Sequence, residues 1–255
     1  MFFSEKLKSF KNLSHCFFSR RNGSSSGIYK SLNCGLGSKD SKASVVKNLQ
    51  KVSKYFNIKP NDLKIMNQTH SSKVLVLDEK NKFFNRFESD ALITKLHKIA
   101  IGVLSADCIP ILFYDKKNNV IGCVHAGWKG ARSGVIENTV AKFRSLNKKN
   151  EIFSAVGPCI GKDSYEVGNE FVDLFIRDKR ENSIFFNEKN NNKFYFDLRG
   201  YVNSILEKCD ISGIENINMD TVKDEENFFS FRRSTLNGDK DYGRCISVIL
   251  INSLN

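Results

Sequence analysis

Between residues 74 and 125 the chain consists largely of short apolar runs, each bounded by turn-forming or charged residues. Apolar runs of roughly four to eight residues that are rich in β-branched side chains are typical of buried β-strands. Strands are expected at residues 74–77, 91–94, 99–105, 109–114 and 120–125, and further along the chain at 153–156 and 245–251. We therefore expect β-strands to make up a large part of the fold.

Fewer segments have the residue spacing of an amphipathic helix. Residues 41–56 follow the segment SKDS, which is a typical signal for the start of a helix. Residues 130–146 carry an apolar face at helical spacing, formed by Val135, Ile136, Val140 and Phe143. Shorter helices are expected at 169–175 and 198–209, whereas residues 16–35 are expected to be mostly loop. The predicted fold class is therefore mixed α/β.

The composition supports one folded domain. Hydrophobic residues make up 40% of the chain and include 21 Phe, which is enough apolar surface for a sizeable core. No Pro-rich, Ser-rich or single-sign segment divides the chain, which has only three prolines. Residues 1–255 are therefore expected to form a single domain.

Targeting signals and cysteine usage predict a cytoplasmic protein. The first residues, MFFSEKLKSFKN, lack the apolar segment that a secretory signal needs. The longest apolar run, 99–114, is interrupted by Asp107 and is shorter than the ~20 residues of a membrane span. The seven cysteines form no CxxC pair, so a disulfide framework is not expected. A functional cysteine in this chain should be a ligand or a nucleophile.

The formal charge of +12 raises the question of nucleic-acid binding. The lysines are scattered and mixed with asparagine, and no basic stripe alternates with aromatic residues as in single-strand binders. We therefore expect neither nucleic acid nor a membrane as a partner, whereas a small anionic substrate is compatible with this charge. No sequence pattern indicates an oligomeric state.

Two of the four histidines lie in site-like places. His70 ends the segment NQTH at the edge of a predicted strand, and His125 lies in VHAGWKG, where a strand runs into a turn of small residues. Cys108 follows Asp107 directly after an apolar strand, where a buried acid is costly unless it is paired or used.

Two imidazoles and one thiolate match the ligand set of a catalytic zinc ion with an open fourth position. The spacings fit no local zinc-finger pattern, so a buried thiol and two hydrogen-bonded histidines are the alternative interpretation. His15 and His97 are interpreted as structural or exposed residues.

Further candidates for binding lie in glycine-containing and arginine-containing segments. The segment GWKG predicts a close turn at the start of a helix, where Trp128 either covers a base or packs outside the core. Arg20 and Arg21 suit phosphate, because a guanidinium can bind two phosphate oxygens at once, but they also fit an exposed loop. The same two interpretations apply to Arg232 and Arg233.

Taken together, the motifs resemble those of the YfiH-like family, long labelled polyphenol oxidase or laccase-domain proteins and regarded as zinc purine nucleoside phosphorylases. The resemblance covers nearly the whole chain and rests on the segments FFSRRNG, SLNCG, QTH, DALIT, SADCIPILFYD, VHAGWKG, VGPCIG, YEVG and FFSFRR. It implies zinc ligands at His70, Cys108 and His125, and a layered α/β fold of the α/β/β/α type with central mixed sheets flanked by helices.

The chain departs from the family pattern at three places. Asn22 stands in place of the first of two paired glycines, Ser164 in place of a cysteine before YEVG, and Asp220 in place of a cysteine before a threonine. None of these departures removes a zinc ligand. Asn22 puts the shape of the Arg20 loop in question, because Asn adopts positive φ less freely than Gly.

The resemblance implies phosphorolysis of adenosine, inosine and guanosine, and of methylthioadenosine, with phosphate as the second substrate. It also implies deamination of adenosine at the same metal, since a zinc-bound water can attack C6 of adenine. Asp107, Cys108 and His125 are the predicted catalytic residues, with Asp107 as candidate proton donor. The predicted substrate-binding residues are Arg20, Asn33, Gln68 and Trp128.

Three other functions fit some of the same residues. A cysteine-type amide hydrolase acting on cell-wall peptides would use Cys108 as nucleophile and His125 as base. A copper-dependent phenol oxidase fits the older family label, but four histidines supply few imidazoles for a multicopper centre, so copper is the less favoured metal. A structural zinc module would need a fourth protein ligand, and the sequence offers three candidates.

Overall fold

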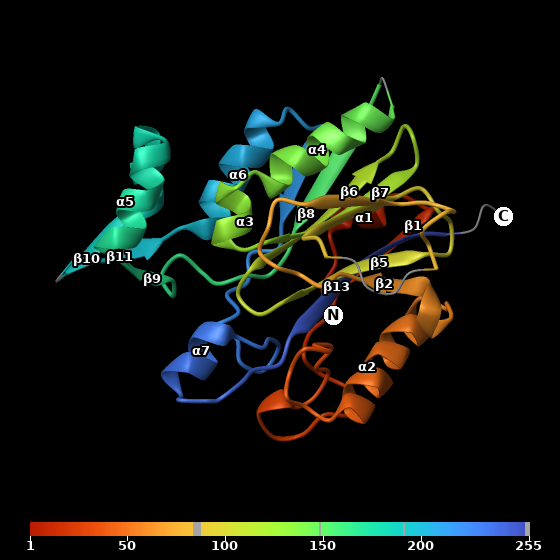
Figure 1. Ribbon diagram of the computed structural model, residues 1–255, viewed down its shortest axis with the longest axis horizontal. Helices are drawn as coiled ribbons and strands as arrows, with labels where there is room; N and C mark the ends of the chain where they lie inside the picture. Colours follow the sequence, from red (N-terminus) through yellow and green to blue (C-terminus); the bar gives the residue numbers. More distant parts are fainter. Residues whose placement is uncertain (84–87, 148, 191, 253–255) are drawn as a thin grey trace.

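The computed structural model describes residues 1–83, 88–147, 149–190 and 192–252, and it contains two large β-sheets that face each other with helices outside them (Figure 1). The six-stranded sheet has the order β12 (Gly213–Asn216), β8 (Ile152–Val156), β6 (Ile109–Asp115), β7 (Val120–Ala126), β4 (Ala91–Thr94) and β3 (Val74–Leu77). The four-stranded sheet has the order β1 (Leu13–Phe17), β13 (Cys245–Ile251), β5 (Ala100–Ser105) and β2 (Leu63–Ile65). Both sheets are mixed, because each combines parallel and antiparallel pairs.

Helices cover the outer faces of both sheets. The longer helices are α2 (Lys42–Tyr55), which covers the four-stranded sheet, and α4 (Val135–Leu146) and α6 (Leu198–Lys208), which cover the six-stranded sheet (Figure 1). The remaining helices are α1 (Glu5–Lys8), α3 (Trp128–Arg132), α5 (Asn169–Asp178), α7 (Phe231–Leu236), and the 3₁₀ helices η1 (Gly27–Tyr29), η2 (Pro60–Asp62) and η3 (Arg180–Phe185). None of the described helices is long and apolar enough to cross a membrane.

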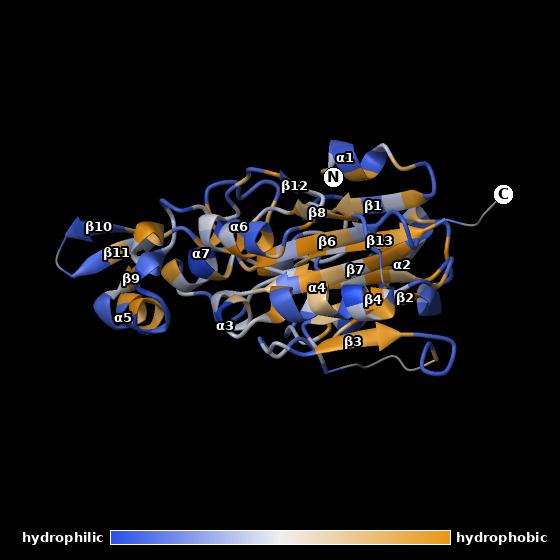
Figure 2. Cartoon of the chain, turned by 90° about the horizontal axis from the view of Figure 1, so that it is seen from above, coloured by the Kyte–Doolittle hydropathy of each residue, from blue (hydrophilic) through white to orange (hydrophobic). Residues whose placement is uncertain are grey.

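The central strands contribute side chains to two cores at once. In β6, Ile111 and Phe113 pack against the helices, whereas Leu112 and Tyr114 pack against the four-stranded sheet. This alternation follows from the β-strand, in which successive side chains point to opposite faces. Because both faces are buried, these strands appear in the sequence as nearly continuous apolar runs, and they form the hydrophobic centre of the molecule in Figure 2.

A third, smaller sheet lies at one end of the molecule, beside α5 (Figures 1 and 2). Its strands are β10 (Phe186–Asn190), β11 (Lys193–Phe196) and β9 (Glu166–Gly168), and all of its pairs are antiparallel. Aromatic rings join it to α5: the ring of Phe196 lies 4.9 Å from Phe175 and 5.3 Å from Phe171 between centroids.

The predicted layered α/β fold is confirmed, and the predicted strands lie within one or two residues of the observed ones. The single helix expected at 130–146 is wrong, because the chain forms α3 and α4 there with a break at Gly134, whose φ is +90°. Apolar spacing cannot reveal such a break, since both helices keep an apolar face toward the same sheet. The prediction also missed several short elements, namely β1, β2, β9 to β12, α1 and α7.

Candidate metal centre

Three segments that are distant in sequence bring His70, Cys108 and His125 together. His70 lies in the loop before β3, Cys108 directly precedes β6, and His125 lies near the end of β7. Because β6 and β7 are antiparallel neighbours with Pro110 opposite His125, the start of one strand lies beside the end of the other. The potential ligand atoms of the three residues lie within 4.8 Å of one another.

The geometry of this cluster suits a tetrahedral metal ion. The distance from Cys108 Sγ to His70 Nε2 is 3.8 Å, and two ligands of a tetrahedral zinc site with one sulfur and one nitrogen are about 3.5 Å apart. His125 is buried, Cys108 is half-buried and His70 is exposed. The cluster is therefore open to solvent on the side of His70, where a fourth ligand has access.

Asp90, which directly precedes β4, holds both histidine segments. One of its carboxylate oxygens accepts a hydrogen bond from His125 Nδ1 at 2.9 Å and from the His70 backbone amide at 3.0 Å. The other accepts from the backbone amide and the hydroxyl of Ser71 at 2.7 and 2.8 Å. Burial raises the pKa of Asp90, but the hydrogen bonds from His125 and Ser71 outweigh it and hold the pKa well below its usual range.

The electrostatics of the cluster favour a thiolate. Burial alone would raise the pKa of the Cys108 thiol, but His125 and His70 lower the pKa below that of a free cysteine. Burial lowers the pKa of His125, whereas Cys108 and Asp90 raise it, and the net direction is upward. The thiolate is the form that binds metals and attacks electrophiles, so the cluster suits both roles.

Gly127 permits the close approach of the ligands. A Cβ atom at this position would lie 2.8 Å from Cys108 Sγ and 2.9 Å from His70 Cδ2. Any larger residue would therefore push two of the three candidate ligands away. The backbone of His70 is itself in the left-handed region, with φ of +58°, and such a conformation persists in a non-glycine residue only when its surroundings hold it.

Asp107 points to a different part of the molecule from its neighbour Cys108. Its carboxylate accepts hydrogen bonds from Thr221 Oγ1 at 2.7 Å, from Ser230 Oγ at 3.0 Å and from the Arg232 backbone amide at 2.6 Å. Burial is the main reason that its pKa is raised, against the effect of these donors. These hydrogen bonds of Asp107 connect the start of β6 to the N-terminus of α7, so they fit a role of Asp107 in positioning these segments. Proton donation by Asp107 stays a prediction.

Arg20 and Asn33 bind backbone groups. The Arg20 guanidinium donates to three backbone carbonyls, of which that of Lys30 is closest at 2.6 Å, and it lies 4.3 Å from the centre of the Phe229 ring. Asn22 in the same loop has φ of +65°, so the loop keeps a left-handed residue at this position. Asn33 is buried and accepts hydrogen bonds through Oδ1 from two backbone amides.

Gln68 and Trp128, two of the predicted substrate-binding residues, contact other parts of the fold. The Gln68 side chain binds both backbone groups of Leu104 in β5, with Nε2 donating to the carbonyl at 2.7 Å and Oε1 accepting from the amide at 2.8 Å. This pairing attaches the NQTH segment to the four-stranded sheet. Trp128 packs edge-on against Phe171 of α5 at 4.9 Å between ring centroids.

The two remaining histidines do not belong to the cluster. His15 Nε2 accepts a hydrogen bond from the Ser4 backbone amide at 2.8 Å, and His97 Nδ1 lies 2.8 Å from the carbonyl oxygen of Asn252.

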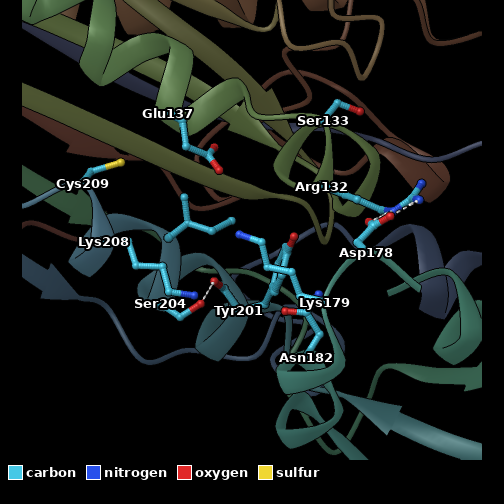
Figure 3. A pocket seen from close by; sticks show the side chains of 11 residues that line it. Arg132, Ser133, Glu137, Asp178, Lys179, Asn182, Tyr201, Ser204, Lys208 and Cys209 are labelled. Atoms are coloured by element: carbon cyan, nitrogen blue, oxygen red, sulfur yellow. Dashed lines mark hydrogen bonds and ion pairs between the residues drawn. The ribbon is translucent and has the colours of Figure 1, made fainter. Parts of the chain in front are cut away.

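A separate cavity of about 540 Å³ contains none of the predicted site residues (Figure 3). It lies beside α4 and α6, and at its edge Arg132 and Asp178 form a two-pronged ion pair with N–O distances of 2.5 and 2.9 Å. It also carries no cluster of potential metal ligands among the described residues. The three candidate metal ligands therefore lie outside this cavity.

Sequence reasoning missed Asp90, Ser71 and Gly127. Asp90 had a usable signal, because it is an acid directly before an apolar strand, in the segment DALIT. A buried acid is costly unless paired, and the same argument that drew attention to Asp107 applies to Asp90. Gly127 begins the segment GWKG, for which a close turn was predicted, but its approach to Cys108 and His70 was not. Ser71 carries no comparable signal, since small residues beside a turn are common.

A family model described as multi-copper polyphenol oxidoreductase laccase matches residues 14–252. A protein of Haemophilus influenzae named purine nucleoside phosphorylase is 31% identical over 241 residues, covering 94% of this chain and 94% of that protein. A protein of Rickettsia prowazekii with the same enzyme name is 33% identical over 193 residues, covering 75% of this chain and 78% of that protein.

Solved structures show the same fold. A Neisseria meningitidis protein superimposes with a TM-score of 0.84 and 30% identity, covering 95% of this chain and 96% of that one. The hypothetical protein YfiH of Bacillus licheniformis superimposes with a TM-score of 0.87 and 25% identity, covering 94% of this chain and 93% of that one.

Proposed function

Since this chain belongs to the YfiH family of laccase-domain proteins, several of whose members are named purine nucleoside phosphorylases, we propose that it is a zinc-dependent purine nucleoside phosphorylase. The proposed substrates are adenosine, inosine, guanosine and methylthioadenosine, together with phosphate. The observation that carries the proposal is the cluster of His70, Cys108 and His125, which joins two imidazoles and a thiolate and is open on one side.

The donor set favours zinc over copper. Imidazole and thiolate are both zinc ligands, and three protein ligands with an open fourth position are typical of catalytic zinc sites. A blue-copper site also uses two His and one Cys, but it adds a weak axial ligand. A multicopper centre needs many imidazoles, whereas His15 and His97 bind other parts of the chain. The family description mentions copper. Because the chain offers so few imidazoles, copper-dependent phenol oxidation is the less favoured alternative.

In phosphorolysis, a phosphate oxygen forms a bond to C1′ of the ribose while the bond from C1′ to N9 of the purine breaks. The products are ribose 1-phosphate and the free base, and the base must gain a proton as it leaves. A zinc ion bound by the three residues would supply Lewis-acid polarisation of the purine or of a water molecule. Asp90 keeps His125 oriented for this purpose through the hydrogen bond at Nδ1.

Two candidates complete the proposed reaction. Arg20 has five guanidinium N–H groups and donates three hydrogen bonds to carbonyls, so the remaining groups are available to phosphate. Asp107 would deliver the proton only by exchanging one of its present donors for a substrate atom. We also propose the accompanying deamination of adenosine, in which water adds at C6 and ammonia leaves.

The alternative with specific structural support is a cysteine-type amide hydrolase. Cys108, His125 and Asp90 form a chain of nucleophile, base and orienting carboxylate, which is the arrangement of several cysteine hydrolases. His70 argues against this alternative, because its Nε2 lies 3.8 Å from the same sulfur and has no role in such a chain.

The test is a product assay on metal-loaded protein. We expect roughly one zinc ion per chain and release of hypoxanthine from inosine only when phosphate is present, with ribose 1-phosphate as the second product. The Cys108→Ala variant should lose both the metal and the activity, whereas Cys209→Ala, a half-buried cysteine outside the cluster, should keep both.

Two results would contradict this function. A Cys108→Ala variant that loses the metal but keeps the phosphorolysis rate would exclude a metal-centred reaction. A covalent adduct on Cys108, formed by an amide substrate in metal-free protein, would establish the hydrolase instead.

A further inference from the structure

Asp90 is the one described carboxylate that hydrogen-bonds the segments of both histidines in the cluster. We propose that Asp90 is a positioning residue that sets the tautomer of His125 and the conformation of the His70 loop, and thereby determines the affinity of the chain for its metal. This inference rests on the proposed metal centre and goes beyond it, because Asp90 contributes no ligand atom.

The first part of the argument concerns His125. A carboxylate only accepts hydrogen bonds, so the 2.9 Å contact between Asp90 Oδ1 and His125 Nδ1 requires a proton on Nδ1. In the neutral ring the lone pair then lies on Nε2, which is the nitrogen left to face the metal site. The backbone amide of His125 also donates to the Asp90 carbonyl at 2.8 Å, so the two residues are held side by side.

The second part concerns the loop that carries His70. The amides of Thr69, His70 and Ser71 donate to the Asp90 carboxylate at 3.2, 3.0 and 2.7 Å. These three consecutive donors surround a residue with φ of +58°, a conformation that costs a non-glycine residue energy. The carboxylate, which is fully buried, therefore stabilises the backbone conformation that directs His70 toward Cys108.

An amide at position 90 could not serve both histidines. Asparagine has one oxygen that accepts and one NH₂ group that donates. With the NH₂ group toward His125, Nδ1 must accept, and the ring proton moves to Nε2, where it blocks the metal. With the oxygen toward His125, the NH₂ group faces the amide of Ser71, and two donors oppose each other.

The experiment compares Asp90→Asn with Asp115→Asn by titration of metal-free protein with zinc against a chromophoric chelator. Asp115 is a matched control, because it is fully buried and accepts hydrogen bonds from Asn118, Asn150 and two backbone amides. We expect Asp90→Asn to weaken zinc binding about 10–100-fold and Asp115→Asn to leave it unchanged.

A second measurement reports the tautomer directly. Nitrogen-15 NMR of the histidine side chains is recorded on the metal-free protein at alkaline pH, where the imidazole rings are neutral. His125 should then carry its proton at Nδ1 in the wild type and at Nε2 in Asp90→Asn. A purely structural role of Asp90 would lower stability without moving this proton. Ser71→Ala removes the hydroxyl's hydrogen bond to Asp90 and the one it accepts from the Lys73 amide. It leaves the contact between Asp90 and His125 in place, so it should weaken zinc binding less and leave the tautomer unchanged.

The outcomes separate this inference from the proposed function. If the wild type binds no zinc, the proposed metal-dependent function fails. If the wild type binds zinc and Asp90→Asn binds it equally tightly, the role of Asp90 is refuted while the function stands. A neutral wild-type His125 ring protonated at Nε2 alone would also refute it, even if Asp90→Asn does not fold.

Discussion

Ser164 and Asp220 are two of the positions at which the chain departs from the family pattern, and their side chains are in contact. Ser164 Oγ donates a hydrogen bond to Asp220 Oδ2 at 2.6 Å. Their separation in sequence gave no reason to connect them. At the residue scale, side-chain identity shows what each group can donate or accept, but the fold determines which groups meet.

His15 provides a test at the same scale that does not involve the metal. Burial lowers its pKa from 6.5 to about 4, because the charged ring would lose its hydration in a site closed to water. The unfolded chain therefore binds a proton between pH 6.5 and pH 4 that the folded protein does not, so stability is complete above pH 6.5 and falls as the pH approaches 4. The loss attributable to this residue is about 3 kcal/mol.

The measurement is the melting temperature of the wild type and of His15→Gln as a function of pH. The Gln oxygen can accept from Ser4 as the imidazole does, but it does not titrate. Between pH 6.5 and pH 4 the wild type should lose roughly 6–12 °C more than the variant. Parallel curves would show that His15 does not govern acid stability.

Strands were easier to predict than helix boundaries at the scale of elements. A central strand buried on both faces leaves an uninterrupted apolar run, so β6 and β13 could be located to within a residue. The small sheet of β9 to β11 has polar exposed positions, and β10 is mostly exposed, so its apolar pattern was too weak to detect. The break between α3 and α4 depends on the backbone of Gly134 rather than on hydrophobic spacing.

The break between α3 and α4 leads to a testable prediction about Gly134. A Cβ at this position meets no atom closer than 3.8 Å, so the cost of Gly134→Ala comes from its φ of +90° and not from a clash. We expect the variant to lose about 1–2 kcal/mol of stability in chemical denaturation. Gly37→Ala is the control, because Gly37 is exposed, has no close neighbours and lies outside the left-handed region. Equal stability of the two variants would contradict this explanation.

At the scale of the whole molecule, the candidate ligands come from three segments, which are attached to or form part of the two large sheets. Gln68 attaches the His70 segment to β5 of one sheet, whereas Cys108 directly precedes β6 and His125 lies in β7 of the other. A metal bound there would link these parts of the folded chain, and the unfolded chain would not hold the three ligands together. Metal binding should therefore stabilise the whole fold.

This expectation can be measured as a thermal shift. With free zinc at ~100 times its dissociation constant, the linkage contributes about 2.7 kcal/mol, which corresponds to a rise in melting temperature of roughly 5–10 °C for a chain of this size. A strong chelator should reverse the rise, and Cys108→Ala should show little of it. A wild-type melting temperature that does not respond to zinc would argue against a metal site at this cluster.

The sequence by itself determined the main secondary-structure elements and the types of side chain that could serve as metal ligands. Apolar runs and helical spacing located the main strands and helices, and the family motifs named His70, Cys108 and His125 as ligands. Residue types also limited the chemistry, because two imidazoles and a thiolate suit zinc or copper rather than magnesium or calcium.

Only the tertiary structure decided which groups share a site. Strand pairing places the start of β6 beside the end of β7, and Asp90, directly before β4, hydrogen-bonds both histidine segments. Hydrogen bonds and metal coordination act over a few ångströms in space, whereas periodicity along the chain reports only on local conformation. For that reason the three candidate ligands could be named from the sequence, whereas the hydrogen bonds of the buried Asp90 carboxylate to both histidine segments are visible only in the folded chain.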